Sequence, residues 1–147
     1  VVHMTNKKKK VLFICIHNSA RSQMAETFLN DLGGEKFEAE SAGLEPGTLN
    51  PLVVKVMAEA GYDISGNSTN SVFDFHRAKR SYDIVVAVCS KEAEERCPIF
   101  PGTGARLHWP FDDPSSMPGS EEERLQATRR IRDQIRARIE EFIAENE

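Results

Sequence analysis

Two apolar runs with no polar alternation constrain the fold more than any other feature of this sequence. They lie at the ends of KKVLFIC, residues 9–15, and YDIVVAVC, residues 82–89. Strands of this kind are typical of a parallel sheet that is covered on both faces. The runs end in Cys15 and Cys89. Because the carboxyl ends of parallel strands meet at one edge of a sheet, we expect both sulfurs at that edge.

Helical patterns alternate with these strands, and their ends are marked by specific residues. A glycine pair stops the first helix, an Asn-Pro pair starts the second, and a Ser-x-x-Glu capping box starts the last. These residues are Gly33, Gly34, Asn50, Pro51, Ser120 and Glu123. Shorter helices are expected at residues 70–79 and 90–96. An apolar stripe runs along one face of the last helix, at Leu125, Thr128, Ile131, Ile135, Ile139 and Phe142.

Further strands are expected at residues 36–43 and 105–111, which gives an alternation of strands and helices along the whole chain. This alternation predicts an α/β fold with a mostly parallel four-stranded sheet and helices on both faces. At 147 residues, we expect a single domain at residues 9–147. Residues 1–8 are expected to be a disordered lead-in, in which VVHM is a tag ahead of Met4.

Composition and charge exclude several classes of function. The net charge of −4 argues against a nucleic-acid partner, which calls for a basic surface. No apolar run approaches the ~18 residues of a membrane span, and no secretory signal is evident, so we expect no membrane contact and a cytoplasmic location. In that reducing compartment the three cysteines are expected to be reactive or buried thiols rather than structural disulfides.

The segment CIHNSARS, residues 15–22, has the composition of an anion-binding loop with a nucleophile at its base. A turn from a strand to a helix N-terminus directs several backbone N–H groups into one concavity. That positive end and a nearby cation favour the thiolate of Cys15, while Arg21 can bind two oxygens of a tetrahedral oxyanion. The Ser22 hydroxyl can donate to the sulfur. The expected oxyanion-binding residues are Ile16, His17, Asn18, Ser19, Ala20, Arg21 and Ser22.

Four segments, in this order, resemble the arsenate reductase branch of the low-molecular-weight protein tyrosine phosphatase superfamily. They are CIHNSARSQMAE, SAG at residues 41–43, CSKEAEERCPIFPG at residues 89–102 and HWPFDDP at residues 108–114. The resemblance implies a three-layer, flavodoxin-like fold and reduction of arsenate to arsenite, with thioredoxin as reductant and no cofactor. It also implies that Asp113, directly before a proline, is the proton donor, with Asp112 as the local competitor.

The other two cysteines distinguish a reductase from a phosphatase. Reduction needs two electrons, which a pair of thiols supplies by becoming a disulfide. We expect Cys89 to resolve the adduct on Cys15, and Cys97 then to attack Cys89. If residues 90–96 are helical, Cys89 and Cys97 lie ~12 Å apart, so this helix must unwind before they can pair. The family pattern has one residue fewer between them.

Other interpretations stay open at this point. One alternative is a phosphatase acting on phosphotyrosine or small phosphomonoesters, and another is a non-catalytic thiol protein that binds arsenite or senses oxidation. No metal is expected. The resemblance points to a weak candidate potassium site at Asn18, Glu26, Ser41 and Asn70, but Asn70 stands where a carboxylate is expected. His17 has no assigned role, and we expect a monomer.

Overall fold

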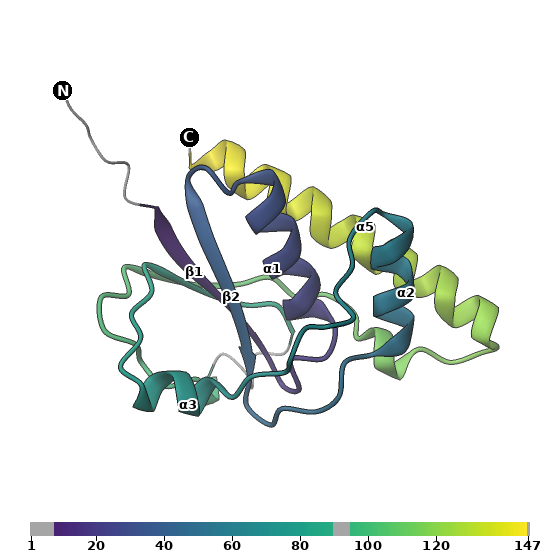
Figure 1. Cartoon of the computed structure of the whole chain (residues 1–147), viewed down its shortest axis with the longest axis horizontal. Coiled ribbons are helices and arrows are strands. Elements are labelled where there is room, and N and C mark those ends of the chain that lie inside the picture. Colours follow the sequence, from purple (N-terminus) through teal and green to yellow (C-terminus); the bar gives the residue numbers. More distant parts are fainter. Residues whose placement is uncertain (1–7, 90–94, 147) are drawn as a thin grey trace.

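Four parallel strands form the centre of the molecule, as the sequence predicts. The computed structural model describes residues 8–89 and 95–146. Its strands are β1 (Lys9–Cys15), β2 (Phe37–Gly43), β3 (Ile84–Ala87) and β4 (Ala105–His108). They are paired in the order β2-β1-β3-β4 (Figure 1). The lead-in predicted at residues 1–8 lies almost entirely outside the described residues.

The register of the sheet determines where the strand ends meet. Cys15, the last residue of β1, is paired with Gly43, the last residue of β2, and Ile14 is paired with Ala87 of β3. Beyond Ala87, the Val88 amide still donates to the Ile14 carbonyl at 3.0 Å. The carboxyl ends of these three strands therefore lie side by side, and the segment that carries Cys89 continues from this edge.

Five helical segments are described. They are α1 (Arg21–Leu32), α2 (Pro51–Glu59), α3 (Val72–Arg77), the 3₁₀ turn η1 (Pro114–Ser116) and α5 (Glu121–Glu145). The predicted caps are confirmed: Asn50 accepts the Leu52 amide, and Ser120 forms a reciprocal capping box with Glu123. The helix at residues 70–79 is shorter than predicted, because Ser71 caps it one residue before its first turn. The helix predicted at residues 90–96 lies largely outside the described part of the chain.

Helices α1 and α5 pack together over one face of the sheet (Figure 1). The predicted stripe of α5 is buried along its whole length, and Phe142 stacks with Phe37 and Trp109. On the opposite face, Phe100 contacts Tyr82 and His76, which joins the loop after Cys97 to the segment around α3. Within residues 8–89 and 95–146, none of the helices is both long and apolar enough to cross a bilayer.

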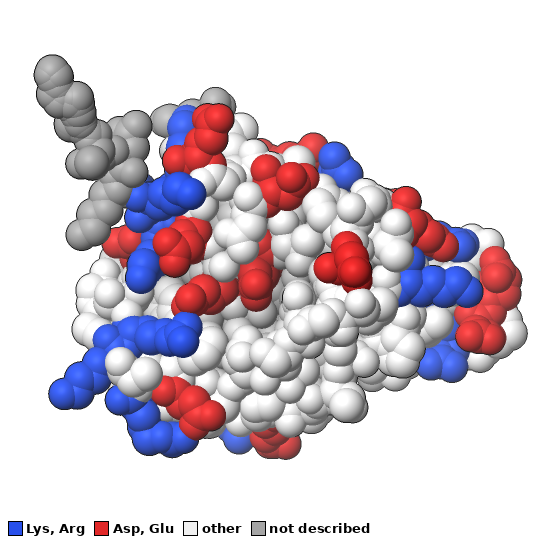
Figure 2. All heavy atoms as spheres, in the orientation of Figure 1, with Lys and Arg blue, Asp and Glu red and all other residues white. Residues whose placement is uncertain are grey.

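Acidic and basic side chains are interspersed over the face shown in Figure 2, so neither sign of charge dominates it. This distribution fits the small net charge of −4. A surface of this kind does not concentrate anions by its general field. An anionic ligand must instead be held by a local arrangement of donors.

We expect Ile135→Ala to lower the free energy of unfolding by about 3 kcal/mol, because it leaves a cavity in the main hydrophobic core, to which this residue of α5 belongs. Ile135 has no solvent exposure. Ile99→Ala is the matched control, since Ile99 is 75% exposed, and it should change stability by less than about 0.5 kcal/mol. Urea unfolding followed by circular dichroism measures both. Equal losses in the two variants would contradict the core described above.

Candidate active site

The loop between β1 and α1 turns its carbonyl groups outward. The amides of residues 44, 45, 47 and 50 donate to the carbonyls of residues 15, 16, 17 and 19, at 2.8–3.2 Å. Among the described residues, no backbone carbonyl accepts the amides of residues 16, 17 and 19–22. The first helical turn of α1 also has no side-chain cap at Ala20. The loop therefore presents a set of N–H donors to its interior, which is the arrangement of an anion-binding site.

Cys15 lies at the base of this loop and is only 3% exposed. Its sulfur accepts a hydrogen bond from the Asn18 amide at 3.1 Å and lies 3.0 Å from the Ser22 hydroxyl oxygen. That oxygen already accepts the Asn18 side-chain amide at 2.8 Å. With Cys15 as a thiolate, the Ser22 hydroxyl donates its proton to the sulfur, and this contact and that of the Asn18 amide both favour the charged form.

These contacts lower the pKa of the Cys15 thiol from 9.0 to about 6. The largest cause is a hydrogen bond from the Cys89 thiol, followed by those from Ser22 and Asn18 and by the charge of Arg21. Burial of the sulfur opposes them, because it disfavours the charged form. The hydrogen bonds outweigh burial, so Cys15 is mostly a thiolate at neutral pH.

Cys89 lies beside Cys15, at the sheet edge where the two apolar runs predicted it. The Cys89 sulfur lies 3.9 Å from the carbonyl oxygen of Ile14, the residue before Cys15, and its side chain is the largest contributor to the lowered pKa of Cys15. A side-chain nitrogen of His108, at the end of β4, lies 2.9 Å from the Cys89 carbonyl oxygen and tethers that peptide to the sheet. No disulfide joins the three cysteines.

Cys97 lies in a different environment. Its thiol is buried and donates to the Pro98 carbonyl at 3.4 Å. Burial raises the pKa of the Cys97 thiol from 9.0 to about 11, although the nearby Arg106 charge acts in the opposite direction. Cys97 is therefore protonated at neutral pH in this conformation. The chain between Cys89 and Cys97 includes residues 90–94, which lie outside the described part.

Arg21 and Asp113 meet at the mouth of the loop. One guanidinium nitrogen of Arg21 donates to the Phe111 carbonyl at 2.8 Å, and another lies 3.8 Å from the Asp113 carboxylate. Asp113 also accepts the Ser115 amide at 2.9 Å, which caps η1. Asp112, the competitor for the acid role, is exposed. The structure therefore brings Asp113 to the predicted site.

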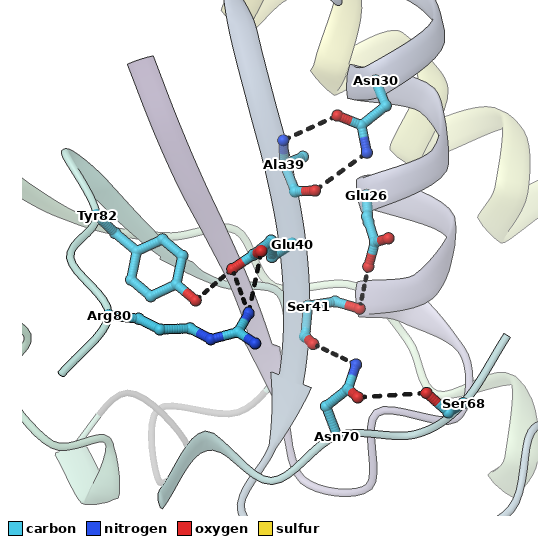
Figure 3. Close-up of polar contacts among 9 residues, drawn as sticks. All are labelled: Glu26, Asn30, Ala39, Glu40, Ser41, Ser68, Asn70, Arg80 and Tyr82. Carbon is cyan, nitrogen blue, oxygen red and sulfur yellow. Dashed lines mark hydrogen bonds and ion pairs between the residues drawn. The ribbon is translucent and has the colours of Figure 1, made fainter. Parts of the chain in front are cut away.

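Glu26, Ser41 and Asn70 of the candidate potassium site lie together (Figure 3), and the Asn70 backbone amide donates to the side-chain oxygen of the fourth residue, Asn18, at 2.8 Å. The Ser41 hydroxyl donates to Glu26 at 2.5 Å, and burial raises the pKa of that carboxyl. Asn70 turns its amide N–H toward the Ser41 carbonyl at 3.1 Å and its oxygen toward Ser68. A cation needs oxygen ligands at these positions. Asn70 thus turns a nitrogen toward Ser41 at the position where a carboxylate oxygen was expected, and the described residues contain no cluster of three or more potential His, Cys, Asp or Glu ligands.

Two residues that hold the site together were not predicted. Asn50 was expected only as a helix cap, yet its amide nitrogen also donates to the Ser115 hydroxyl at 2.8 Å and its backbone amide donates to Ser19. It thereby joins the segment of Asp113 to the anion-binding loop. Gln23 is buried and contacts both Asn18 and Ser68. The sequence gives no signal for its burial, because its helical neighbours Glu26, Thr27 and Asn30 are all polar.

A thiolate, a guanidinium and a carboxyl group around an amide-lined loop define a class of enzymes with a cysteine nucleophile that act on tetrahedral oxyanions. The model of the low molecular weight phosphotyrosine protein phosphatase family matches residues 10–146, and the chain belongs to this family. The resemblance seen in the sequence is thereby confirmed.

Relatives of known function and structure support the same placement. The arsenate reductase of Bacillus subtilis (strain 168) is 41% identical over 136 residues, which cover 92% of this chain and 96% of the relative. A solved arsenate reductase in the phosphate binding state has a TM-score of 0.74 at 33% identity, covering 93% of this chain and 98% of its own. A thioredoxin-dependent arsenate reductase of Corynebacterium glutamicum has a TM-score of 0.68 at 29% identity, covering 94% and 60% of the two chains.

The pH dependence of Cys15 alkylation tests the thiolate. Iodoacetamide labelling, followed by mass spectrometry of the Cys15 peptide, should have its midpoint at a pH of about 6. Ser22→Ala removes a donor to the anion, so the pKa of Cys15 should rise by about one unit. Ser19→Ala, in the same loop, is the control and should leave the midpoint unchanged. A midpoint that stays the same in Ser22→Ala would contradict the described contacts.

Proposed function

We propose that this protein reduces arsenate to arsenite, with Cys15 as the nucleophile and Cys89 and Cys97 as successive resolving thiols. The observation that carries the proposal is the position of Cys89 just beyond the end of the strand next to that of Cys15, with its sulfur 3.9 Å from the carbonyl oxygen of Ile14 and its side chain lowering the pKa of Cys15, because a second thiol at the nucleophile serves a reduction and not a hydrolysis. The arsenate reductases among the relatives support the same activity.

In the first step the anion binds in the loop formed by residues 16–22, with Arg21 as the charged partner of two of its oxygens. The Cys15 thiolate attacks arsenic, an As–S bond forms, and one As–O bond breaks. Asp113 donates a proton to the departing oxygen, which leaves as water. The basis for this role is the contact of Asp113 with Arg21, 3.8 Å apart at the mouth of the loop.

In the second step the Cys89 sulfur, after losing its proton, attacks the Cys15 sulfur. The S–S bond forms as the S–As bond breaks, and the electron pair of that bond stays on arsenic, which leaves as arsenite. The two thiols have then supplied the two electrons of the reduction. The hydrogen bond that joins the two sulfurs in the resting state holds Cys89 next to the atom that it must attack.

In the third step the Cys97 thiolate attacks Cys89, which releases the Cys15 thiolate and leaves a Cys89–Cys97 disulfide. The buried, protonated Cys97 of the described conformation is a poor nucleophile, so this step requires a change in the surroundings of the Cys97 thiol. Thioredoxin, on which the Corynebacterium glutamicum relative depends, is the proposed reductant of the final disulfide. We also propose that the protein is a monomer and that it acts in the reducing cytoplasm. A reducing compartment is needed because all three cysteines must start as thiols.

A phosphatase is the second candidate, and one observation favours it. Cys15, Arg21 and Asp113 are arranged around a loop whose donors would accept phosphate as readily as arsenate, since the two anions share shape and charge. The solved relative in the phosphate binding state agrees with such binding. Phosphate ester hydrolysis, however, leaves Cys89 without a function.

Replacing each resolving cysteine separates the two activities. We expect Cys89→Ser to abolish arsenate turnover with thioredoxin but to keep hydrolysis of p-nitrophenyl phosphate within about threefold of wild type, because the serine hydroxyl still donates to Cys15. Cys97→Ser is the matched comparison. It should release one arsenite per protein and then stop at a Cys15–Cys89 disulfide, which mass spectrometry detects.

Two outcomes would count against the reductase. One is full arsenate turnover in Cys89→Ser, since the proposed chemistry cannot release arsenite catalytically without this thiol. The other is vigorous phosphatase activity in the wild-type protein without any arsenite production, which would favour the second candidate.

The assignment of the acid is tested by a pair of adjacent variants. Asp113→Asn should lower the turnover rate about a hundredfold, because the departing oxygen loses its proton donor. Asp112→Asn removes the same charge from the exposed neighbour and should leave the rate within about twofold. Steady-state kinetics at saturating substrate measure both, and similar losses in the two variants would contradict the assignment.

A further inference from the structure

Asn18 donates its backbone amide to the Cys15 sulfur from a left-handed conformation. Its φ is 55°, a region that residues other than glycine seldom adopt, although asparagine tolerates it better than most. The residue is fully buried, and the amide reaches the sulfur at 3.1 Å. If the backbone relaxed to an ordinary negative φ, this N–H would point elsewhere. Something in the structure must therefore hold Asn18 in place.

Gln23 contacts Asn18 at its two oxygen atoms. The side-chain nitrogen of Gln23 donates to the Asn18 carbonyl at 3.1 Å and lies 3.3 Å from the Asn18 side-chain oxygen. The same nitrogen donates to the Ser68 carbonyl at 3.0 Å, and the Gln23 oxygen accepts the Asn67 side chain at 3.1 Å. Gln23 is 1% exposed and stands on the first turn of α1. A rigid helix thus holds one side of the strained peptide.

The second tether of Asn18 comes from the same loop that Gln23 contacts. The Asn70 amide donates to the Asn18 side-chain oxygen at 2.8 Å, and Asn70 is anchored on the Ser41 carbonyl of β2 (Figure 3). Gln23 therefore lies where α1, the anion-binding loop and residues 67–70 meet. Its side-chain nitrogen donates to the buried Asn18 carbonyl oxygen. No other donor to this oxygen is found among the described residues, so loss of the Gln23 amide would favour rotation of the Asn18 peptide away from its present orientation.

We propose that Gln23 is a positioning residue, which holds Asn18 in the left-handed conformation from which its amide stabilises the Cys15 thiolate. The side-chain contacts described for Gln23 are with Asn18, Asn67 and Ser68, so its effect on the sulfur is transmitted through Asn18. The inference rests on the proposed role of Cys15 as the nucleophile. Gln23 lies outside the anion-binding loop and acts on the nucleophile by orienting Asn18.

Gln23→Met tests this role, because methionine fills a similar volume but cannot donate a hydrogen bond. The midpoint pH of iodoacetamide labelling at Cys15 should rise by about one unit, equivalent to about tenfold less thiolate at low pH. Arsenate turnover should then fall about fivefold at a pH of about 6 and stay near wild type at a pH of about 8. A general loss of structure would lower the rate at both values.

Asn30→Ala is the matched control. Asn30 lies on the same helix and also makes two hydrogen bonds with a backbone, at Ala39 of β2, but it does not contact the loop (Figure 3). It should leave the labelling midpoint unchanged. An unchanged midpoint in folded Gln23→Met, or an equal shift in Asn30→Ala, would overturn the proposal. If Gln23→Met does not fold, Asn67→Ala replaces it: a smaller shift in the same direction supports the role, and none overturns it.

Labelling of Cys15 does not involve arsenate, so its outcome is independent of the proposed reaction. A shifted midpoint in a protein that fails to reduce arsenate would leave the role of Gln23 intact and overturn only the proposed function. An unshifted midpoint in a protein that does reduce arsenate would overturn the role of Gln23 and leave the proposed function intact.

Discussion

The structure of the site depends on the stabilisation of one buried anion. Burial by itself disfavours the Cys15 thiolate, and hydrogen bonds from its surroundings, together with the charge of Arg21, reverse that effect. The donors come from distant parts of the sequence: Ser22 and Asn18 follow β1, whereas Cys89 follows β3. They converge because β1 and β3 are parallel neighbours whose carboxyl ends coincide. The order of the strands in the sheet therefore determines which donors reach the Cys15 sulfur.

The same hydrogen bond also orders the proposed reaction. While Cys15 is a thiolate, the Cys89 side chain stabilises its charge, and Cys15 is the sulfur that attacks the substrate first. Once the Cys15 sulfur is bonded to arsenic it carries no charge and is a weaker acceptor. The restraint on the Cys89 proton is then released at the stage where this residue must attack. Cys97, with a pKa raised to about 11 by burial, reacts only after its environment changes.

The parts of the site that were predictable from the sequence follow from local patterns. The apolar runs locate the ends of β1 and β3, and with them the neighbouring positions of Cys15 and Cys89, while the Asn50 and Ser120 caps locate α2 and α5. The contacts of Gln23 with Ser68 and of Asn50 with Ser115 were not predictable, because they join segments 45 and 65 residues apart whose approach depends on the packing of irregular loops. The spacing of apolar and polar residues along the sequence does not predict contacts between such loops.

The replacement of an expected carboxylate by Asn70 changes how this anion is balanced. An aspartate at this position would add a negative charge near the loop and call for a cation to offset it. The amide instead donates to Ser41 and leaves Glu26 as the one carboxyl group of the cluster, with a pKa raised by burial. The groups that lower the pKa of Cys15 are Arg21 and oriented hydrogen-bond donors. Dipoles act only at short range and in the correct orientation, so the restraint that holds the Asn18 amide toward the sulfur is part of this support.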